Sequence, residues 1–139
     1  MNFTILIADD EKNIREGLGA ALEMDGYSIL LAEDGEEAML YLRGKGKFAG
    51  SPRPDIIILD LNLPKKDGRE VLREIKEDSN LKNIPVVILT TSNAEKDILR
   101  TYDLHANAYI TKPLDFNEFM KVVESIESFW LEIVQLPTK

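Results

Sequence analysis

The chain has 139 residues, with 17 Lys and Arg, 25 Asp and Glu, one His and no Cys, and its formal net charge is −8. This length suits one domain that buries a core without disulfides or a structural metal. The acidic balance argues against nucleic-acid binding, which needs clustered Lys and Arg. The lack of Cys excludes a disulfide scaffold, a thiolate zinc site and a Cys nucleophile, and one His cannot build a multi-histidine metal site. Any chemistry must therefore depend on carboxylates, hydroxyls and lysines.

The sequence also carries no sign of a membrane segment or a secretory leader. No apolar run is long enough to span a bilayer, and Met1 leads directly into a strand-like run without a basic segment. We therefore expect a cytoplasmic protein.

Apolar runs of strand length alternate with segments of helical period along the whole chain. The expected strands cover residues 3–8, 27–32, 55–60, 85–89 and 108–110. The expected helices cover residues 12–24, 36–43, the region of 71–75, 98–104 and 116–136. Between Asp55 and Asp60 the chain is continuously apolar, which is typical of a central strand buried on both faces. Five strand–helix units predict an α/β fold with a parallel sheet between helices.

Residues able to do chemistry follow the carboxyl ends of these strands, where open parallel sheets bind their ligands. They are Asp9, Asp10 and Glu11 after the first strand, Asp60 at the end of the third, Thr90 to Ser92 after the fourth and Lys112 after the fifth. Each of these alone is commonly a helix cap or a solvated charge. Their common placement at one edge of the sheet favours a functional site.

Carboxylates that share a pocket repel each other unless a cation compensates them. A hard divalent cation such as Mg²⁺ prefers such oxygen ligands. An Asp carboxylate can also act as a nucleophile towards phosphorus. The charge that develops on the phosphoryl oxygens would then be neutralised by Mg²⁺, by the ammonium of Lys112 and by the hydroxyl of Thr90.

Several strings of the sequence resemble the receiver domains of two-component response regulators. They are ILIADDE at 5–11, IILDLNLP at 57–64, DG at 67–68, PVVILTT at 85–91 and YITKP at 109–113. The match to the family covers nearly the whole length of the chain, and these strings occur in the same order as the motifs of the family. The resemblance implies a flavodoxin-like (βα)5 fold, a doubly wound parallel sheet with strand order 2-1-3-4-5. It also implies a single receiver domain over residues 1–139, with an extended C-terminal helix and no output domain.

The resemblance assigns the phosphoryl acceptor and the metal ligands. Asp60 accepts a phosphoryl group from the phosphohistidine of a sensor histidine kinase. Asp10 and Asp60 bind Mg²⁺ together with the backbone carbonyl of Asn62, and Asp9 assists through a water molecule.

The resemblance also implies a switch. Lys112 pairs with the phosphorylated carboxylate, Thr90 moves towards the phosphoryl group and Tyr109 changes rotamer with it. Asn62 and Ser92 occupy positions that tune the phosphoryl lifetime. His105 departs from the pattern, because most receivers have Gly after the fourth helix; a role as a surface residue or helix-end cation is favoured for it over catalysis.

A narrower similarity concerns the strings at 97–109 and 129–137, which are similar to stand-alone receivers paired with phytochrome-like kinases. In such a regulator, phosphorylation remodels the surface formed by residues 98–104, 108–110 and the last helix. The signal then leaves through a partner protein or through self-association. The chain would catalyse only its own phosphorylation and dephosphorylation, so it is not predicted to be an enzyme in the usual sense.

The last predicted helix carries two apolar stripes, although a surface helix usually buries one. The second stripe predicts a homodimer face, because exposed apolar patches mark interfaces; the alternative is that the tail or a neighbouring helix covers it. This face consists of Phe116, Met120, Val123, Trp130 and Val134. Ile14 is a candidate residue for kinase docking, and an ordinary half-buried core position is an equal alternative.

Two other classes compete with this assignment. A phosphohydrolase of the haloacid-dehalogenase type would need a second Asp where Asn62 stands, because an amide cannot act as the general acid. A flavin- or nucleotide-binding module would need a phosphate-binding loop after the first strand, where Asp9, Asp10 and Glu11 would repel phosphate. A receiver that no longer takes phosphate is disfavoured because Asp60 and Lys112 are both present.

Overall fold

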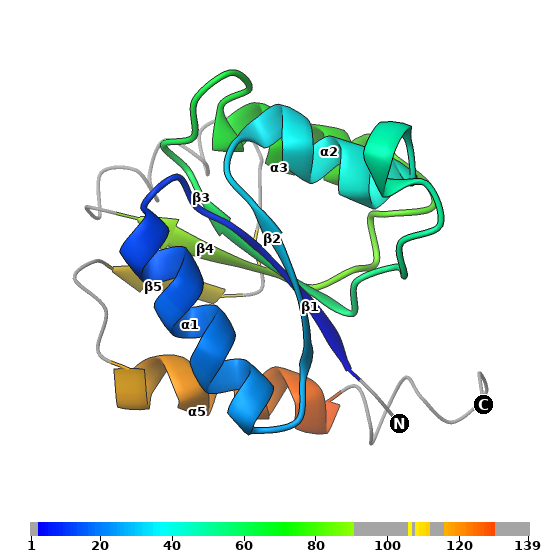
Figure 1. Ribbon diagram of the computed structural model, residues 1–139. Coiled ribbons are helices and arrows are strands. Elements are labelled where there is room, and N and C mark those ends of the chain that lie inside the picture. The colour runs from blue at the N-terminus through cyan, green and yellow to red at the C-terminus, as the bar shows by residue number, and fades with distance from the viewer. Residues whose placement is uncertain (1–2, 91–105, 107, 112–115, 130–139) are drawn as a thin grey trace.

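The computed structural model describes residues 3–90, 106, 108–111 and 116–129. Within these residues, five strands form one parallel sheet in the order β2-β1-β3-β4-β5 (Figure 1). The strands are β1 Thr4–Ala8, β2 Ser28–Ala32, β3 Ile56–Asp60, β4 Val86–Thr90 and β5 Ala108–Thr111. The α/β class, the parallel pairing and the predicted strand order are therefore confirmed.

Four helices and one short 3-10 turn complete the described structure. They are α1 Lys12–Met24, α2 Gly35–Arg43, η1 Gly46–Phe48, α3 Gly68–Glu77 and α5 Phe116–Phe129. Helices α1 and α5 cover one face of the sheet, and α2 and α3 cover the other (Figure 1). The predicted helix 98–104 and the part of the last helix after residue 129 lie outside the described residues. None of the helices in the described ranges is both long and apolar enough to cross a membrane.

Local sequence signals explain where α2 and α3 begin. The side chain of Asp34 accepts a hydrogen bond from the backbone N–H of Glu37 at 2.8 Å, and that of Asp67 accepts one from the N–H of Arg69 at 2.8 Å. Both carboxylates thereby satisfy an N–H that the first helical turn leaves without a partner.

The core consists of two layers, one on each face of the sheet, because side chains alternate along a strand. In β1, Ile5 and Ile7 pack towards α1 and α5, whereas Leu6 and Ala8 pack towards α2 and α3. The same alternation holds in β3 and β4, and every residue of these three strands is buried. The sheet is therefore covered on both sides, as the apolar runs predict.

Helix α5 corrects part of the predicted dimer face. Val123 is 0 % exposed and lies in the same core layer as Phe119, which is also 0 % exposed. These residues are four positions apart, so they lie on one side of the helix and both face the sheet. Val123 is thus a core residue and not part of an exposed face. Met120 is half-buried against this layer. The side chains of Phe116, Trp130 and Val134 lie outside the described structure.

Candidate functional site

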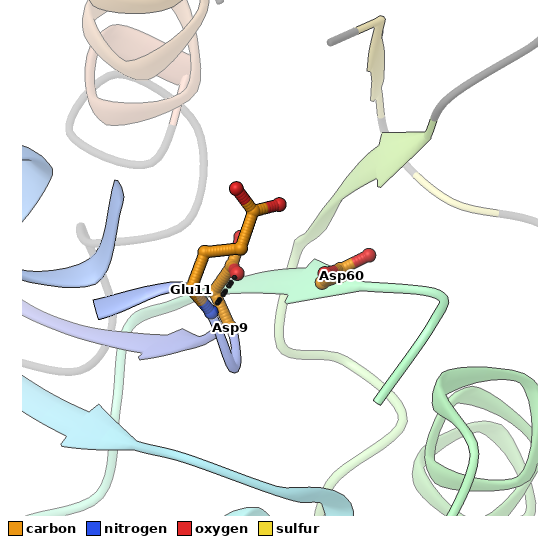
Figure 2. Close-up of side chains that lie close together, drawn as sticks. All are labelled: Asp9, Glu11 and Asp60. Carbon is orange, nitrogen blue, oxygen red and sulfur yellow. Dashed lines mark hydrogen bonds between the residues drawn. The ribbon is translucent and has the colours of Figure 1, made fainter. Parts of the chain in front are cut away.

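The register of the sheet brings two of the predicted carboxylates together. Ala8 pairs with Leu59 where β1 and β3 run side by side, so the next residue on each chain, Asp9 and Asp60, reaches the same edge. Asp9 is 0 % exposed and Asp60 is 2 % exposed. Carboxylate oxygens of Asp9, Glu11 and Asp60 all lie within 4.8 Å of one another (Figure 2). The predicted convergence of acidic side chains at the carboxyl edge is therefore present.

The turn after β1 decides which acidic residues join this cluster. The backbone N–H of Glu11 donates to Oδ1 of Asp9 at 2.8 Å (Figure 2), and the N–H of Asp9 donates to the carbonyl of Ala32 at 3.1 Å. Asp9 and Glu11 therefore lie on the same side of the turn. Asp10, between them, is exposed and is not a member of the cluster. The structure thus gathers Glu11, for which no metal-binding role was predicted, where Asp10 was expected.

The turn after β3 fixes the carboxylate of Asp60. The backbone N–H of Asn62 donates to Oδ1 of Asp60 at 3.0 Å, so the side chain is held by its own following turn. The N–H of Gly68 donates to the carbonyl of Leu61 at 3.0 Å. A Cβ atom on Gly68 would lie 2.3 Å from the carbonyl oxygen of Asp60. The start of α3 is therefore packed directly against the residue that ends β3.

The loop between Asn62 and Gly68 is also held from the β2–α2 connection. The backbone N–H of Gly35 donates to the carbonyl of Pro64 at 3.3 Å, and the Lys65 ammonium lies 3.6 Å from the Asp34 carboxylate. Lys65 has a φ of 66°, a left-handed conformation that non-glycine residues adopt rarely. These contacts hold the segment after Asp60 in one position.

Four predicted site residues remain, and the structure describes three of them. Thr90 is 0 % exposed at the end of β4, next to β3, and pairs with Thr111 of β5. Tyr109 is half-buried against the core layer under α2 and α3. Lys112 lies outside the described residues. Ile14 is half-buried and packs against the core layer under α1, so its role in docking stays a prediction.

The donor set fits a hard divalent cation. Three carboxylates in one place repel one another, and two of them are buried where water cannot relieve that repulsion. Carboxylate oxygens are the ligands that such an ion prefers, and Mg²⁺ is commonly bound through one or two carboxylates together with water. The cluster offers one oxygen from each of three residues in one place.

The fold and this site together define a class of protein. Residues 5–124 match the family described as the response regulator receiver domain, and the chain belongs to that family. It is a receiver-domain response regulator of two-component signalling.

Among curated relatives, the chain is similar to the response regulator Rcp1 of Synechocystis sp., with 47% identity over 135 residues, 96% of this chain and 92% of the relative. Two solved structures are also similar. The phosphorylated cyanobacterial phytochrome response regulator RcpA has 48% identity and a TM-score of 0.78, covering 94% of this chain and 95% of that one. The Mn²⁺-bound form of Rcp1 has 46% identity and a TM-score of 0.76, covering 95% and 96%.

Proposed function

We propose that this regulator accepts a phosphoryl group on Asp60 from a sensor histidine kinase, with Mg²⁺ bound in the acidic cluster. The observation that carries the proposal is the position of Asp60, which ends a fully buried strand within 4.8 Å of the carboxylates of Asp9 and Glu11. Its side chain is held by the N–H of Asn62, so the carboxylate is oriented before any donor arrives.

The transfer step forms one bond and breaks another. An oxygen of Asp60 attacks phosphorus while the bond from phosphorus to the histidine nitrogen breaks. The electron pair stays on that imidazole nitrogen, which takes a proton from solvent. Hydrolysis later restores Asp60 and releases inorganic phosphate. The chain thereby acts only on its own carboxylate, and we do not class it as an enzyme with an external substrate.

Asp9, Glu11 and Asp60 would hold the metal, with Asp10 and the carbonyl of Asn62 as the further ligands that the family resemblance implies. A bound Mg²⁺ would neutralise the charge on the phosphoryl oxygens. The similar regulator Rcp1 has a Mn²⁺-bound form, which supports a divalent ion here. Magnesium affinities of Asp10→Asn and Glu11→Gln test the two candidate ligands, and the variant with the larger loss identifies the stronger one.

The similar regulators RcpA and Rcp1 support a narrower proposal for the partner. RcpA is a phytochrome response regulator, so we assign the kinase of this chain to the phytochrome-like class. Phosphorylation would act through Thr90 and Tyr109 on the surface of β5 and α5. A homodimer through α5 remains part of the proposal, with Met120 and without Val123. Sedimentation that shows only monomers, with and without a phosphoryl mimic, would refute the dimer.

The acceptor is tested with acetyl phosphate and Mg²⁺, followed by separation on a phosphate-affinity gel. We expect a shifted band for the wild type and none for Asp60→Asn. Asp25→Asn is a matched control, because Asp25 is an exposed residue at the end of α1, and it should shift like the wild type. If the band of Asp60→Asn shifted as much as that of the wild type, Asp60 would be refuted as the acceptor. The same would hold if the bands of both proteins stayed unshifted.

A further inference from the structure

Arg15 is a buried cation on α1 beside the acidic cluster. Its residue exposure is 8 %, although a surface helix normally points Arg to solvent. The guanidinium Nη1 donates to the backbone carbonyl of Asp9 at 2.9 Å, and this hydrogen bond is buried. Nη2 lies 3.9 Å from Oε1 of Glu33, the residue that follows β2. The side chain therefore reaches from α1 to the ends of both β1 and β2.

A charge in this position needs compensation that these two contacts supply only in part. The carbonyl of Asp9 is neutral, and the side chain of Glu33 is 69% exposed, so water weakens the long ion pair. Burying a cation is costly unless negative charge lies near it. The buried carboxylate of Asp9 belongs to the same residue whose carbonyl binds the guanidinium. The guanidinium is therefore bound to the backbone of a buried acidic residue of the cluster.

Arg15 also contributes one of the hydrogen bonds that hold Asp9 in place. The N–H of Asp9 donates to Ala32, its Oδ1 accepts from Glu11, and its carbonyl accepts from Arg15. These three bonds fix the backbone on both sides of Asp9 as well as one oxygen of its carboxylate. Without the guanidinium, a buried carbonyl would lose its charged donor, and the turn that brings Asp9 and Glu11 together would lose an anchor on α1.

We propose that Arg15 is a positioning residue for the metal cluster, and that it holds the β1–α1 turn in the geometry that binds a divalent cation. This inference rests on the proposed function, because it assigns a supporting role at the same site. Groups behind the ligands of a metal commonly change its affinity by about 10- to 100-fold. Arg15 does not touch the ion, and it acts through Asp9.

The test compares Mg²⁺ and Mn²⁺ affinities of the full chain and its variants, by calorimetry for Mg²⁺ and by electron paramagnetic resonance for Mn²⁺. We expect Arg15→Met and Arg15→Gln to weaken both affinities by about tenfold. Arg15→Lys keeps the charge and one donor, so it should bind metal more tightly than either. Arg43→Met is the matched control, because Arg43 pairs with Glu74 at the far end of α2 and should leave metal affinity unchanged.

The outcomes separate this inference from the function on which it rests. Metal-free melting curves show which variants are folded, and if Arg15→Met does not fold, Arg15→Gln and Arg15→Lys decide the question. Wild-type affinity in Arg15→Gln, or tighter binding than in the wild type, would overturn the positioning role while leaving the metal site intact. A folded wild type that binds neither ion would instead refute the proposed metal site. An equal loss in the Lys and Gln variants would overturn the role of the charged donor.

Discussion

Two regions of this fold use glycine for different physical reasons. At the carboxyl edge of the sheet, a Cβ atom on Gly35 would lie 1.9 Å from the carbonyl oxygen of Lys66, and one on Gly68 would lie 2.3 Å from that of Asp60. In the connection that leaves α2, Gly44 and Gly50 have positive φ values of 61° and 88°, and a Cβ atom on either would meet nothing within 4 Å. The first pair lacks space, whereas the second pair has an unusual backbone conformation.

The glycines at the carboxyl edge allow backbone segments to pack closely around the candidate site. The glycines after α2 only allow the chain to change direction. The loop after Asp60 is packed against the starts of both α2 and α3, so backbone touches backbone there. The connection after α2 is held by side chains on its outer surface. Tyr41 and Phe48 stack with ring centroids 3.6 Å apart, and Lys47 lies 3.3 Å from Glu37. Substitutions in the first region should therefore affect the site, and substitutions in the second only the stability.

The largest expected effect follows from Gly68→Ala. The added methyl group would overlap the carbonyl of Asp60 and the Cα of Leu61, which are backbone atoms at and just after the end of β3 and cannot move away freely. We expect a loss of about 3 kcal/mol in the free energy of unfolding, measured by urea denaturation. Phosphorylation by acetyl phosphate should fall in the fraction that remains folded. A variant with wild-type stability and phosphorylation would contradict the close packing of this edge.

An intermediate effect is expected for Gly44→Ala, which adds a side chain where there is space but the φ is left-handed. The cost should be about 1 kcal/mol in the free energy of unfolding. Gly44→Asn should cost less, because Asn tolerates this conformation. Phosphorylation and metal affinity should be unchanged in both variants. If Gly44→Ala impaired phosphorylation as strongly as Gly68→Ala, the contrast between the two regions would fail.

The smallest effect concerns the pH dependence of the stacked Tyr41. Burial raises the pKa of its phenol above 10.0, and the charge of Glu37 adds to this, while Lys47 opposes it. The folded state therefore holds the phenol proton more tightly than the unfolded state. The resulting stability is present below about pH 10 and is lost as the pH rises through the raised pKa. From about pH 9 to 11, the wild type should lose more free energy of unfolding than Tyr41→Phe, and the difference should be small because the phenol is partly exposed to water. An equal loss of free energy of unfolding in the wild type and Tyr41→Phe would contradict the raised pKa of Tyr41.

The sequence predicted those parts of the fold and site that depend on one strand at a time. The apolar runs located the strands, and Asp9 and Asp60 were placed at the correct edge because parallel strands end together. Glu11 was named among the acidic residues after the first strand, but its position two residues after Asp9 was not used to bring the two side chains together. The resemblance directed attention to Asp10 instead, and the structure leaves Asp10 exposed.

Features that depend on contacts between distant segments were not visible in the sequence. Arg15 lies between Ile14 and Glu16 in a helix, where the local sequence does not predict burial. Its guanidinium is buried because it contacts residues at the ends of β1 and β2. Val123 was assigned to an exposed stripe because the sequence does not show which side of the last helix faces the sheet. That orientation depends on tertiary packing. In the connection after α2, the 3-10 turn and the stack of Phe48 on Tyr41 likewise arise from packing on that helix.

The order of the strands also sets the distance over which the proposed phosphorylation of Asp60 would act on the edge of the sheet. Only β4 separates β3 from β5, and neighbouring strands lie about 4.8 Å apart, so the edge strand is about 10 Å from the strand that ends in Asp60. That span is similar to the distance over which salt screens charges in solution, about 8 Å at physiological ionic strength. The path here runs through buried strand backbone, from which ions are excluded. A charge placed on Asp60 would therefore act on β5 with little dependence on the salt around the protein.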